Sequence, residues 1–251
     1  MRRTLEIGER TFGSEHPIVA VPLSNLASLL LATNRPSEAE PLMKRALVIT
    51  ERFFGPEHPY VATALNNLGQ LLKSTNRLTE AESLMRRALA IDEQAYGPEH
   101  PNVAIRLNNL AVLLKSTNRQ TEAEPLMRRA LTIDERSFGP DHPDVSTDLN
   151  NLALLLQDTN RLSEAEQLMR RALTIDERSF GSDHPKVAIP LSNLAMIELV
   201  KGNNNEAEAM LTRALEIFRR SYKDENHPRV RETLRRLEEV RGKSGRGGRA
   251  E

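Results

Sequence analysis

The chain contains no cysteine and no tryptophan, and its 251 residues include only three tyrosines and six phenylalanines. Without cysteine it has no disulfide framework, thiolate nucleophile or zinc-thiolate site. Its 35 basic residues balance 35 acidic ones, so no net field draws it to nucleic acid or an anionic membrane. No apolar run is long enough to span a bilayer. The start, MRRTLEIGER, lacks the apolar segment of a secretory signal, and we therefore expect a cytoplasmic protein.

What the chain does have is a repeat. Each of its six histidines is followed by proline, and the first five of these pairs are 42 residues apart and the last 43. A fixed period of 20 to 50 residues is typical of solenoids, in which each unit buries its apolar face against its neighbours. The pairs begin at His16, His58, His100, His142, His184 and His227.

One repeat, residues 98–139, shows the local pattern. Apolar residues follow the i, i+3, i+4, i+7 spacing of an amphipathic helix over 107–114 and again over 123–133. The sequence therefore predicts a helical hairpin, whose first and second helices we call helix A and helix B. The class is all-α.

The hairpin boundaries carry their own signals. Proline after His100 suits the first position of helix A, and Asn118 suits a left-handed residue where helix A ends. Thr121 with Glu124 matches a capping box at the start of helix B, and Gly139 releases the chain into the next linker. Prolines at 22 and 190 fall inside predicted A helices, where we expect a late start or a kink.

The period divides the chain into consecutive segments. Residues 1–13 match the end of a helix B, which suggests a start at an internal methionine of a longer protein, and 224–240 form a capping helix. The glycine- and arginine-rich tail, 241–251, is expected to be disordered, and its shortness favours a plain terminus over an RNA-binding segment. The five complete repeats are 14–55, 56–97, 98–139, 140–181 and 182–223.

Several motifs recur in phase: LNNLA in helix A, EAEPLMRRALTIDE in helix B and FGPDHPDV in the linker. Together with the 42-residue period they resemble the tetratricopeptide repeats of the kinesin-light-chain type, over residues 1 to about 240. The resemblance implies a right-handed α-solenoid of helical hairpins. It also implies a protein or peptide partner, held in the concave groove that the A helices line.

No catalytic or cofactor site is predicted. Successive histidines are separated by a whole hairpin, and packed helices lie about 8 to 10 Å apart, so the imidazoles cannot converge on one metal ion. Nucleotide-binding and hydrolase motifs are absent. Asp134-Glu135 and their counterparts recur in helix B at regular spacing, which favours a solvated helix face over a catalytic pair. The arginine pairs, such as Arg86-Arg87, are expected to form ion pairs within their own helix.

A stripe of helix A is the predicted binding surface. Residues 105, 108, 112 and 115 lie at helical spacing, away from the buried leucines. Amides offer donors and an acceptor for a peptide backbone, and the lysines of the stripe favour an acidic ligand. The predicted groove residues are Ser24, Asn66, Gln70, Lys73, Asn108, Val112, Lys115, Asn150, Leu154 and Ser192.

Two interpretations of the asparagines stay open. The second asparagine of each pair, such as Asn109, occurs in all five repeats and favours a structural role. The first becomes serine in the outer repeats, which favours a role in the groove. The function predicted is a non-enzymatic scaffold that binds an extended, acidic peptide, without nucleic acid, membrane or cofactor. The alternative is a self-assembling or spacer repeat module of a larger signalling protein, with self-association through the solenoid ends.

Overall fold

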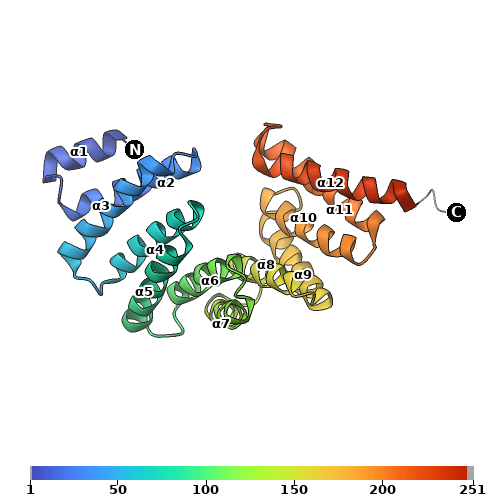
Figure 1. Cartoon of the computed structure of the whole chain (residues 1–251), viewed down its shortest axis with the longest axis horizontal. Helices are drawn as coiled ribbons and strands as arrows, with labels where there is room; N and C mark the ends of the chain where they lie inside the picture. The colour runs from blue at the N-terminus through green and yellow to red at the C-terminus, as the bar shows by residue number, and fades with distance from the viewer. Residues whose placement is uncertain (1, 248–251) are drawn as a thin grey trace. The chain divides into compact units, whose positions relative to one another are not determined.

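The computed structural model describes residues 2–247, and within them every regular element is a helix. Figure 1 shows these helices in chain order. They are α1 (Arg2–Phe12), the short 3-10 helix η1 (Pro17–Val19), α2 (Ala20–Ala32), α3 (Pro36–Phe54), α4 (Pro59–Ser74), α5 (Leu78–Tyr96), α6 (Pro101–Ser116), α7 (Gln120–Phe138), α8 (Pro143–Asp158), α9 (Leu162–Phe180), α10 (Pro185–Val200), α11 (Asn204–Tyr222) and α12 (Pro228–Gly247).

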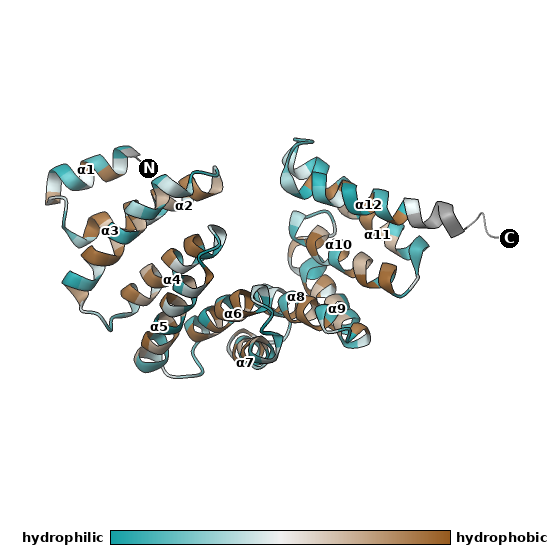
Figure 2. Ribbon diagram, in the orientation of Figure 1, coloured by the Kyte–Doolittle hydropathy of each residue, from teal (hydrophilic) through white to brown (hydrophobic). Residues whose placement is uncertain are grey.

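The helices form two compact units, Met1–Ile133 and Asp134–Glu251. Within each unit a helix A packs against the helix B that follows it, as α4 does against α5 and α8 against α9. A helix B also packs against the next helix A of the same unit, as α5 does against α6 in the first unit and α9 against α10 in the second. Hydrophobic and hydrophilic residues alternate along the helices (Figure 2), and the buried hydrophobic residues of paired helices form shared clusters. Each unit is therefore a stack of helical hairpins.

The core of each repeat is built from three helices. In the first unit Val61 and Leu65 of α4 pack with Ile91 of α5, and Leu47 of α3 closes the cluster from the preceding repeat. Helices A and B also approach closely at a small residue: a Cβ on Gly69 of α4 would lie 3.0 Å from Met85 Cγ of α5. The other repeats have alanine at the position of Gly69. Burial of helix A thus requires both its own helix B and the previous one.

The His-Pro pairs are helix caps. Each histidine precedes its helix in extended conformation, and its Nδ1 accepts a hydrogen bond from the backbone N–H two residues on, for example 3.1 Å from Asn102 N to His100 Nδ1. The imidazole also stacks on the aromatic residue that ends the preceding helix B, as His100 does on Tyr96 with ring centroids 4.5 Å apart. The predicted linker and cap role is confirmed.

The loop residues behave as their types require. Asn118 has φ of 58° and Gly139 has φ of 90°, both in the region that disfavours other side chains. Asparagines at the ends of α2, α4 and α8 share the left-handed conformation of Asn118. These residues end helix A and helix B at fixed places in each repeat.

We expect His100→Ala to destabilise the protein by about 1 kcal/mol, because the first turn of α6 loses its side-chain acceptor. His100→Asn restores an acceptor at the cap and should recover most of that loss, although it lacks the stacking on Tyr96. Urea denaturation of the three proteins measures the difference. Equal stabilities of the alanine and wild-type proteins would contradict the capping role.

Two local predictions need correction, at the start of helix B and at Pro190. Helix B begins before the expected capping box: α5 starts at Leu78, so Thr79 lies inside the first turn, and the cap residue Arg77 makes no side-chain cap bond. Proline is tolerated in a first turn. The late start predicted for the first repeat is confirmed, because α2 begins at Ala20 after η1. The late start predicted for the fifth repeat is wrong, because α10 begins at Pro185 and continues through Pro190.

The capping helix is longer than the sequence predicts. We expected it to end at residue 240, but α12 continues to Gly247. Its outward face is charged, with Arg235 between Glu232 and Glu239. The rest of the predicted disordered tail, 248–251, lies outside the described residues, as does Met1.

Arginines of helix B connect successive repeats. Arg87 Nη1 donates to Glu51 Oε1 of the previous helix B at 2.7 Å, and its Nη2 donates to the Pro56 carbonyl in the linker at 3.0 Å. Only the first arginine of the pair, Arg86, is bonded within its helix, to Glu82. The prediction of intrahelical pairs was therefore wrong for the second arginine. The same inter-repeat bonds are made by Arg45, Arg129, Arg171 and Arg213.

Candidate functional site

The predicted stripe lies on helix A, and the structure places its members at different depths. In the first unit Asn66 is buried, with 6% of its surface exposed, whereas Ser24, Gln70 and Lys73 are half-buried. In the second unit Ser192 is buried. The remaining members, Asn108, Val112, Lys115, Asn150 and Leu154, are half-buried.

The asparagine pairs form a ladder between neighbouring A helices. Asn109 Nδ2 of α6 donates to Asn66 Oδ1 of α4 at 3.0 Å. The second unit repeats this bond between Asn193 of α10 and Asn150 of α8, at 2.9 Å. The second asparagine of a repeat therefore holds the first asparagine of the repeat before it.

The ladder leaves one group of the first asparagine unused. The Oδ1 atoms of Asn66 and Asn150 accept the ladder bonds, and neither Nδ2 donates a hydrogen bond to any described residue. The ladder fixes the orientation of these amides. Each presents an N–H donor whose direction is set before any ligand arrives.

The two lysines of the first unit lie close to each other. Burial lowers the pKa of the Lys73 ammonium from its ordinary value, and the positive charge of Lys115 lowers it further. Lys73 makes no ion pair within residues 2–247. An anion placed beside it would relieve both effects.

The ladder ends differently at the capping helix. Arg236 of α12 occupies the place of the second asparagine, and its Nη1 donates to Ser192 Oγ at 3.1 Å and to Asn193 Oδ1 at 3.2 Å. Glu232 receives the Nε of the same guanidinium at 2.8 Å. Ser192 is thus tied to the cap, and the stripe of the second unit presents mainly Asn150 and Leu154.

Polar residues that the sequence analysis assigned to solvent are buried between repeats. The aspartates at the end of helix B, Asp92, Asp134 and Asp176, are only 0%, 6% and 6% exposed. They are not a solvated face, because the end of helix B packs against the next helix A. Asp92 and Asp134 each bind a different residue of that helix A, whereas Asp176 lines a cavity.

In the first unit Asp92 meets an arginine. Arg106 Nε of α6 donates to Asp92 Oδ2 at 2.8 Å, and Arg106 Nη2 donates to Thr63 Oγ1 of α4 at 3.0 Å. Both charged side chains are almost wholly buried. The Asp92 Oδ1 atom has no hydrogen-bond partner among the described residues.

In the second unit Asp134 meets another acid. Asp148 of α8 occupies the position of Arg106 one repeat on, and its carboxyl is hydrogen bonded to that of Asp134. Burial, followed by the charge of Asp134, raises the pKa of Asp148 to about 8. Burial also raises the pKa of Asp134 to about 6, although the bond from Asp148 opposes this. The two carboxyls therefore share a proton at a pH at which an exposed aspartate is ionised.

The third aspartate borders a cavity. Pro190 stands where Arg106 stands two repeats earlier. No described side chain of α10 forms an ion pair with Asp176, whose carboxylate is hydrogen bonded to Ser146 of α8. The result is a cavity of about 230 Å³ between α8 and α10. Its wall comprises Pro143, Ser146, Thr147, Asn150, Asp176, Lys186, Ile189, Pro190 and Arg229.

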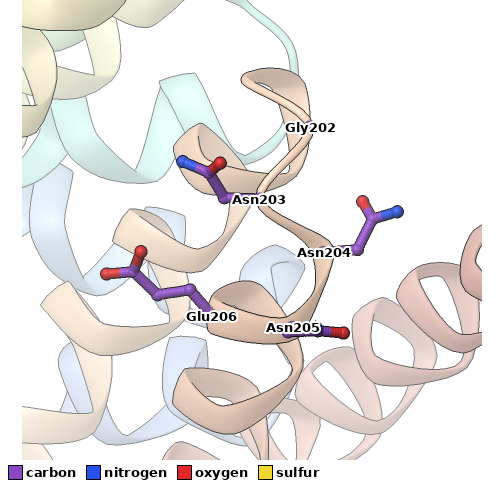
Figure 3. Close-up of a pocket in the computed structure, with 5 residues that line it drawn as sticks. All are labelled: Gly202, Asn203, Asn204, Asn205 and Glu206. Atoms are coloured by element: carbon purple, nitrogen blue, oxygen red, sulfur yellow. The ribbon is translucent and has the colours of Figure 1, made fainter.

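A wider hollow of about 610 Å³ lies at the loop between α10 and α11. Figure 3 shows Asn203 and Glu206 turned to one side and Asn204 and Asn205 turned to the other. Asn203 Nδ2 donates to the buried Glu198 at 2.6 Å, and Glu206 binds Arg170 at 2.9 Å. Asn203 and Glu206, which line this hollow, are therefore part of the network of ion pairs and hydrogen bonds that joins α9, α10 and α11.

Neither a membrane segment nor a metal site is found within residues 2–247. No helix there is long and apolar enough to cross a bilayer. No group of three or more histidine or acidic side chains is arranged to hold a metal ion. The histidines instead cap helices.

One sequence signal marked the buried polar positions. Helix A has Ala64, Arg106, Asp148 and Pro190 at one and the same place in successive repeats, while the neighbouring residues hardly change. The charge at this position changes from repeat to repeat, whereas the residue of helix B that it faces is an aspartate at 92, 134 and 176. The facing residue of helix B cannot be identified from the period alone, because the pairing depends on how the repeats stack.

Comparison with known proteins agrees with the repeat pattern. The family model for the tetratricopeptide repeat matches residues 1–50, 37–94, 74–136, 121–178, 162–220 and 186–251. Comparison with curated proteins found no match.

Solved structures show the same fold. One contains the nearly identical TPR-like repeats described for a Podosopora anserina kinesin light chain, with 22% identity, a TM-score of 0.67, and coverage of 83% of this chain and 99% of that one. Another is BtubC (BKLC) from P. vanneervenii, with 24% identity, a TM-score of 0.72, and coverage of 90% and 91%. The predicted repeat class and all-α solenoid are confirmed.

Proposed function

The chain belongs to the tetratricopeptide repeat family, and on that basis we propose that it is a non-enzymatic scaffold that binds an extended peptide along the helix A stripe. Repeats of this family mediate contacts between proteins. The finer proposal, an acidic peptide held through its backbone, is supported by two features of the stripe.

The asparagine ladder carries the proposal. Asn66 and Asn150 are held by their neighbours through Oδ1, so that each Nδ2 is oriented and unused among the described residues. A peptide carbonyl accepts from such a donor whatever its side chain is. Orientation before binding reduces the entropy lost when the complex forms.

Lys73 supplies selection by charge. A half-buried ammonium beside a second lysine favours a ligand that brings negative charge to it. The same groups disfavour a basic residue at that point of the peptide. The first unit thus prefers an aspartate or glutamate side chain, or a terminal carboxylate.

The donors can be tested without breaking the ladder. Asn66→Asp and Asn150→Asp each keep an oxygen for the neighbouring asparagine but remove the Nδ2 donor. We expect binding of peptides selected from a displayed library to weaken by about tenfold per site, in line with a lost hydrogen bond. Fluorescence anisotropy measures the affinity.

The control is Asn204→Asp, which adds the same charge on the loop after α10. Replacing Asn66, Asn108 and Asn150 together by alanine should abolish binding while helicity persists. Unchanged affinity in the aspartate variants would contradict backbone capture. A collapse of the melting temperature in the triple variant would make the asparagines structural.

Charge selection is tested at Lys73. We expect library selection against the wild-type protein to enrich aspartate and glutamate, and Lys73→Ala to weaken those peptides about fivefold to tenfold, less at high salt. Lys44→Ala is the matched control, because Lys44 is already paired with Glu40. Enrichment of basic or uncharged peptides by the wild-type protein would overturn the acidic preference.

A further inference from the structure

The cavity beside Asp176 has a filled counterpart in the same chain. In the first unit the equivalent space holds the Arg106 guanidinium, which binds Asp92 and Thr63. In the second unit Asp176 and Thr147 stand in the places of Asp92 and Thr63, and Pro190 stands in the place of Arg106. The cavity is therefore lined by hydrogen-bond acceptors equivalent to those that bind Arg106, but this repeat has no arginine at that position.

The acceptors of the two sites match atom by atom. Thr63 Oγ1 donates to the Pro59 carbonyl at 3.3 Å, which leaves its lone pairs for Arg106. Thr147 Oγ1 donates to the Pro143 carbonyl at 3.4 Å in the same way and accepts from no described residue. Since proline has no N–H, Pro190 also leaves the Lys186 carbonyl without its helical partner.

The aspartate of the cavity is buried without a cationic partner in contact. Asp176 is 6% exposed and forms no ion pair with any described residue. Burial raises its pKa, and the Ser146 hydroxyl, Lys186 and His184 lower it by less. A buried carboxylate of this kind is stabilised by a charge-assisted hydrogen bond from a guanidinium.

Two cations border the cavity without filling it. Lys186 Nζ lies over the Phe180 ring, 4.4 Å from its centroid. Arg229 lies at the start of α12, and its side chain forms no ion pair among the described residues. Both are exposed, so that solvent screens them. Lys186 and Arg229 favour an acidic residue in a bound ligand, beside the group that enters the cavity. The group inside the cavity faces Asp176.

We propose that this cavity is a subsite for the guanidinium of an arginine side chain carried by the bound peptide. The guest takes the place that Arg106 occupies in the first unit, with Asp176, Thr147 and the Lys186 carbonyl as acceptors. The proposal rests on the proposed function for the source of the arginine. The site itself can be tested without any peptide.

The first probe is methylguanidinium chloride, followed by the amide signals of residues 143–150 and 186–190 in NMR spectra. We expect saturable shifts in the millimolar range, and no such shifts with urea or with sodium chloride at equal ionic strength. Asp176→Asn keeps the shape of the cavity and should weaken binding by at least about tenfold. The absence of saturable shifts in the wild-type protein would overturn the proposal.

A second variant fills the site from within. Pro190→Arg places in the second unit the residue that Arg106 is in the first, and we expect it to abolish methylguanidinium binding and raise the melting temperature. Arg106→Ala provides the converse control, because it opens the equivalent space and should create a second methylguanidinium site. If Pro190→Arg fails to fold, Asp176→Asn still decides the outcome, and an unchanged affinity there rejects the subsite.

A competition experiment with short peptides distinguishes this proposal from the proposed function. Acetyl-Gly-Arg-Gly-amide and its citrulline analogue differ in charge but hardly in shape, and we expect only the arginine form to compete with methylguanidinium. Loss of acidic-peptide binding in Lys73→Ala tests the stripe, and that variant should leave the guanidinium site intact. Failure of one therefore leaves the other measurable.

Discussion

Replacing Arg106 by leucine is expected to lower the free energy of unfolding of the first unit by about 3–5 kcal/mol, because it leaves the buried Asp92 carboxylate unpaired. The Arg106 guanidinium is the only group that bonds the Asp92 carboxylate within residues 2–247, and the Oδ1 atom already has no partner. Thr63 loses its donor as well. Urea denaturation, together with hydrogen exchange of the α4–α6 amides, measures the effect.

A double variant distinguishes the free energy lost with the Arg106–Asp92 bond from the cost of leaving the Asp92 charge buried without a partner. Asp92→Leu in the Arg106→Leu background removes both charges, and we expect most of the stability to return, since burying a paired charge contributes little net free energy. The same arginine-to-leucine change at Arg52, whose ion pair with Glu15 is exposed, is the control and should cost less than about 1 kcal/mol. Equal losses at both arginines would show that Asp92 is solvated after all.

Stability of the second unit is expected to fall as the pH rises from about 5 to 8. The pKa of Asp148 is about 8 in the folded protein and that of Asp134 about 6, whereas aspartate in an unfolded chain titrates near 3.9. The folded unit therefore binds more protons, and this contribution is full below about pH 4 and lost as the pH rises through the folded values. The loss is on the order of 3 kcal/mol.

Asp148→Asn isolates the pair. An amide donates to Asp134 as the protonated carboxyl does, but it does not titrate, so we expect a nearly flat profile and a gain of stability at pH 8. Asp144, Glu135 and His142, which also act on the pair, are present in both proteins, so their effects cancel in the comparison. Parallel pH profiles from urea denaturation of the two proteins would contradict the shared proton.

The binding stripe shows which features of the site the local sequence pattern predicts. Helical spacing placed Asn66 and Asn150 on the predicted stripe of helix A, because positions on one helix follow from sequence alone. It left open whether the first or the second asparagine is structural. The structure shows that the ladder uses both asparagines. In Asn66 and Asn150 the Oδ1 atom accepts the ladder bond, whereas the Nδ2 atom donates to no described residue.

The buried aspartates show where local pattern stops. Their recurrence at regular spacing in helix B was interpreted as exposure, but recurrence indicates only an equivalent environment, and here that environment is the contact with the next helix A. Whether the carboxylate meets Arg106, Asp148 or the cavity beside Pro190 depends on a residue about 14 positions further along. The two residues belong to different helices, so the period of a helix or a strand does not predict that they are in contact.

The period, the hairpins, the His-Pro caps and the left-handed asparagines follow from the sequence by itself, because they depend on spacing and backbone preference within a few residues. Only the tertiary structure decided which polar groups lose water and which partners they meet, since these depend on how one repeat packs on the next. The Arg87 bonds to Glu51, the acid pair at Asp148 and the cavity beside Asp176 all arise at those contacts. Nearly identical repeats thus share one fold but differ at the surfaces where they meet.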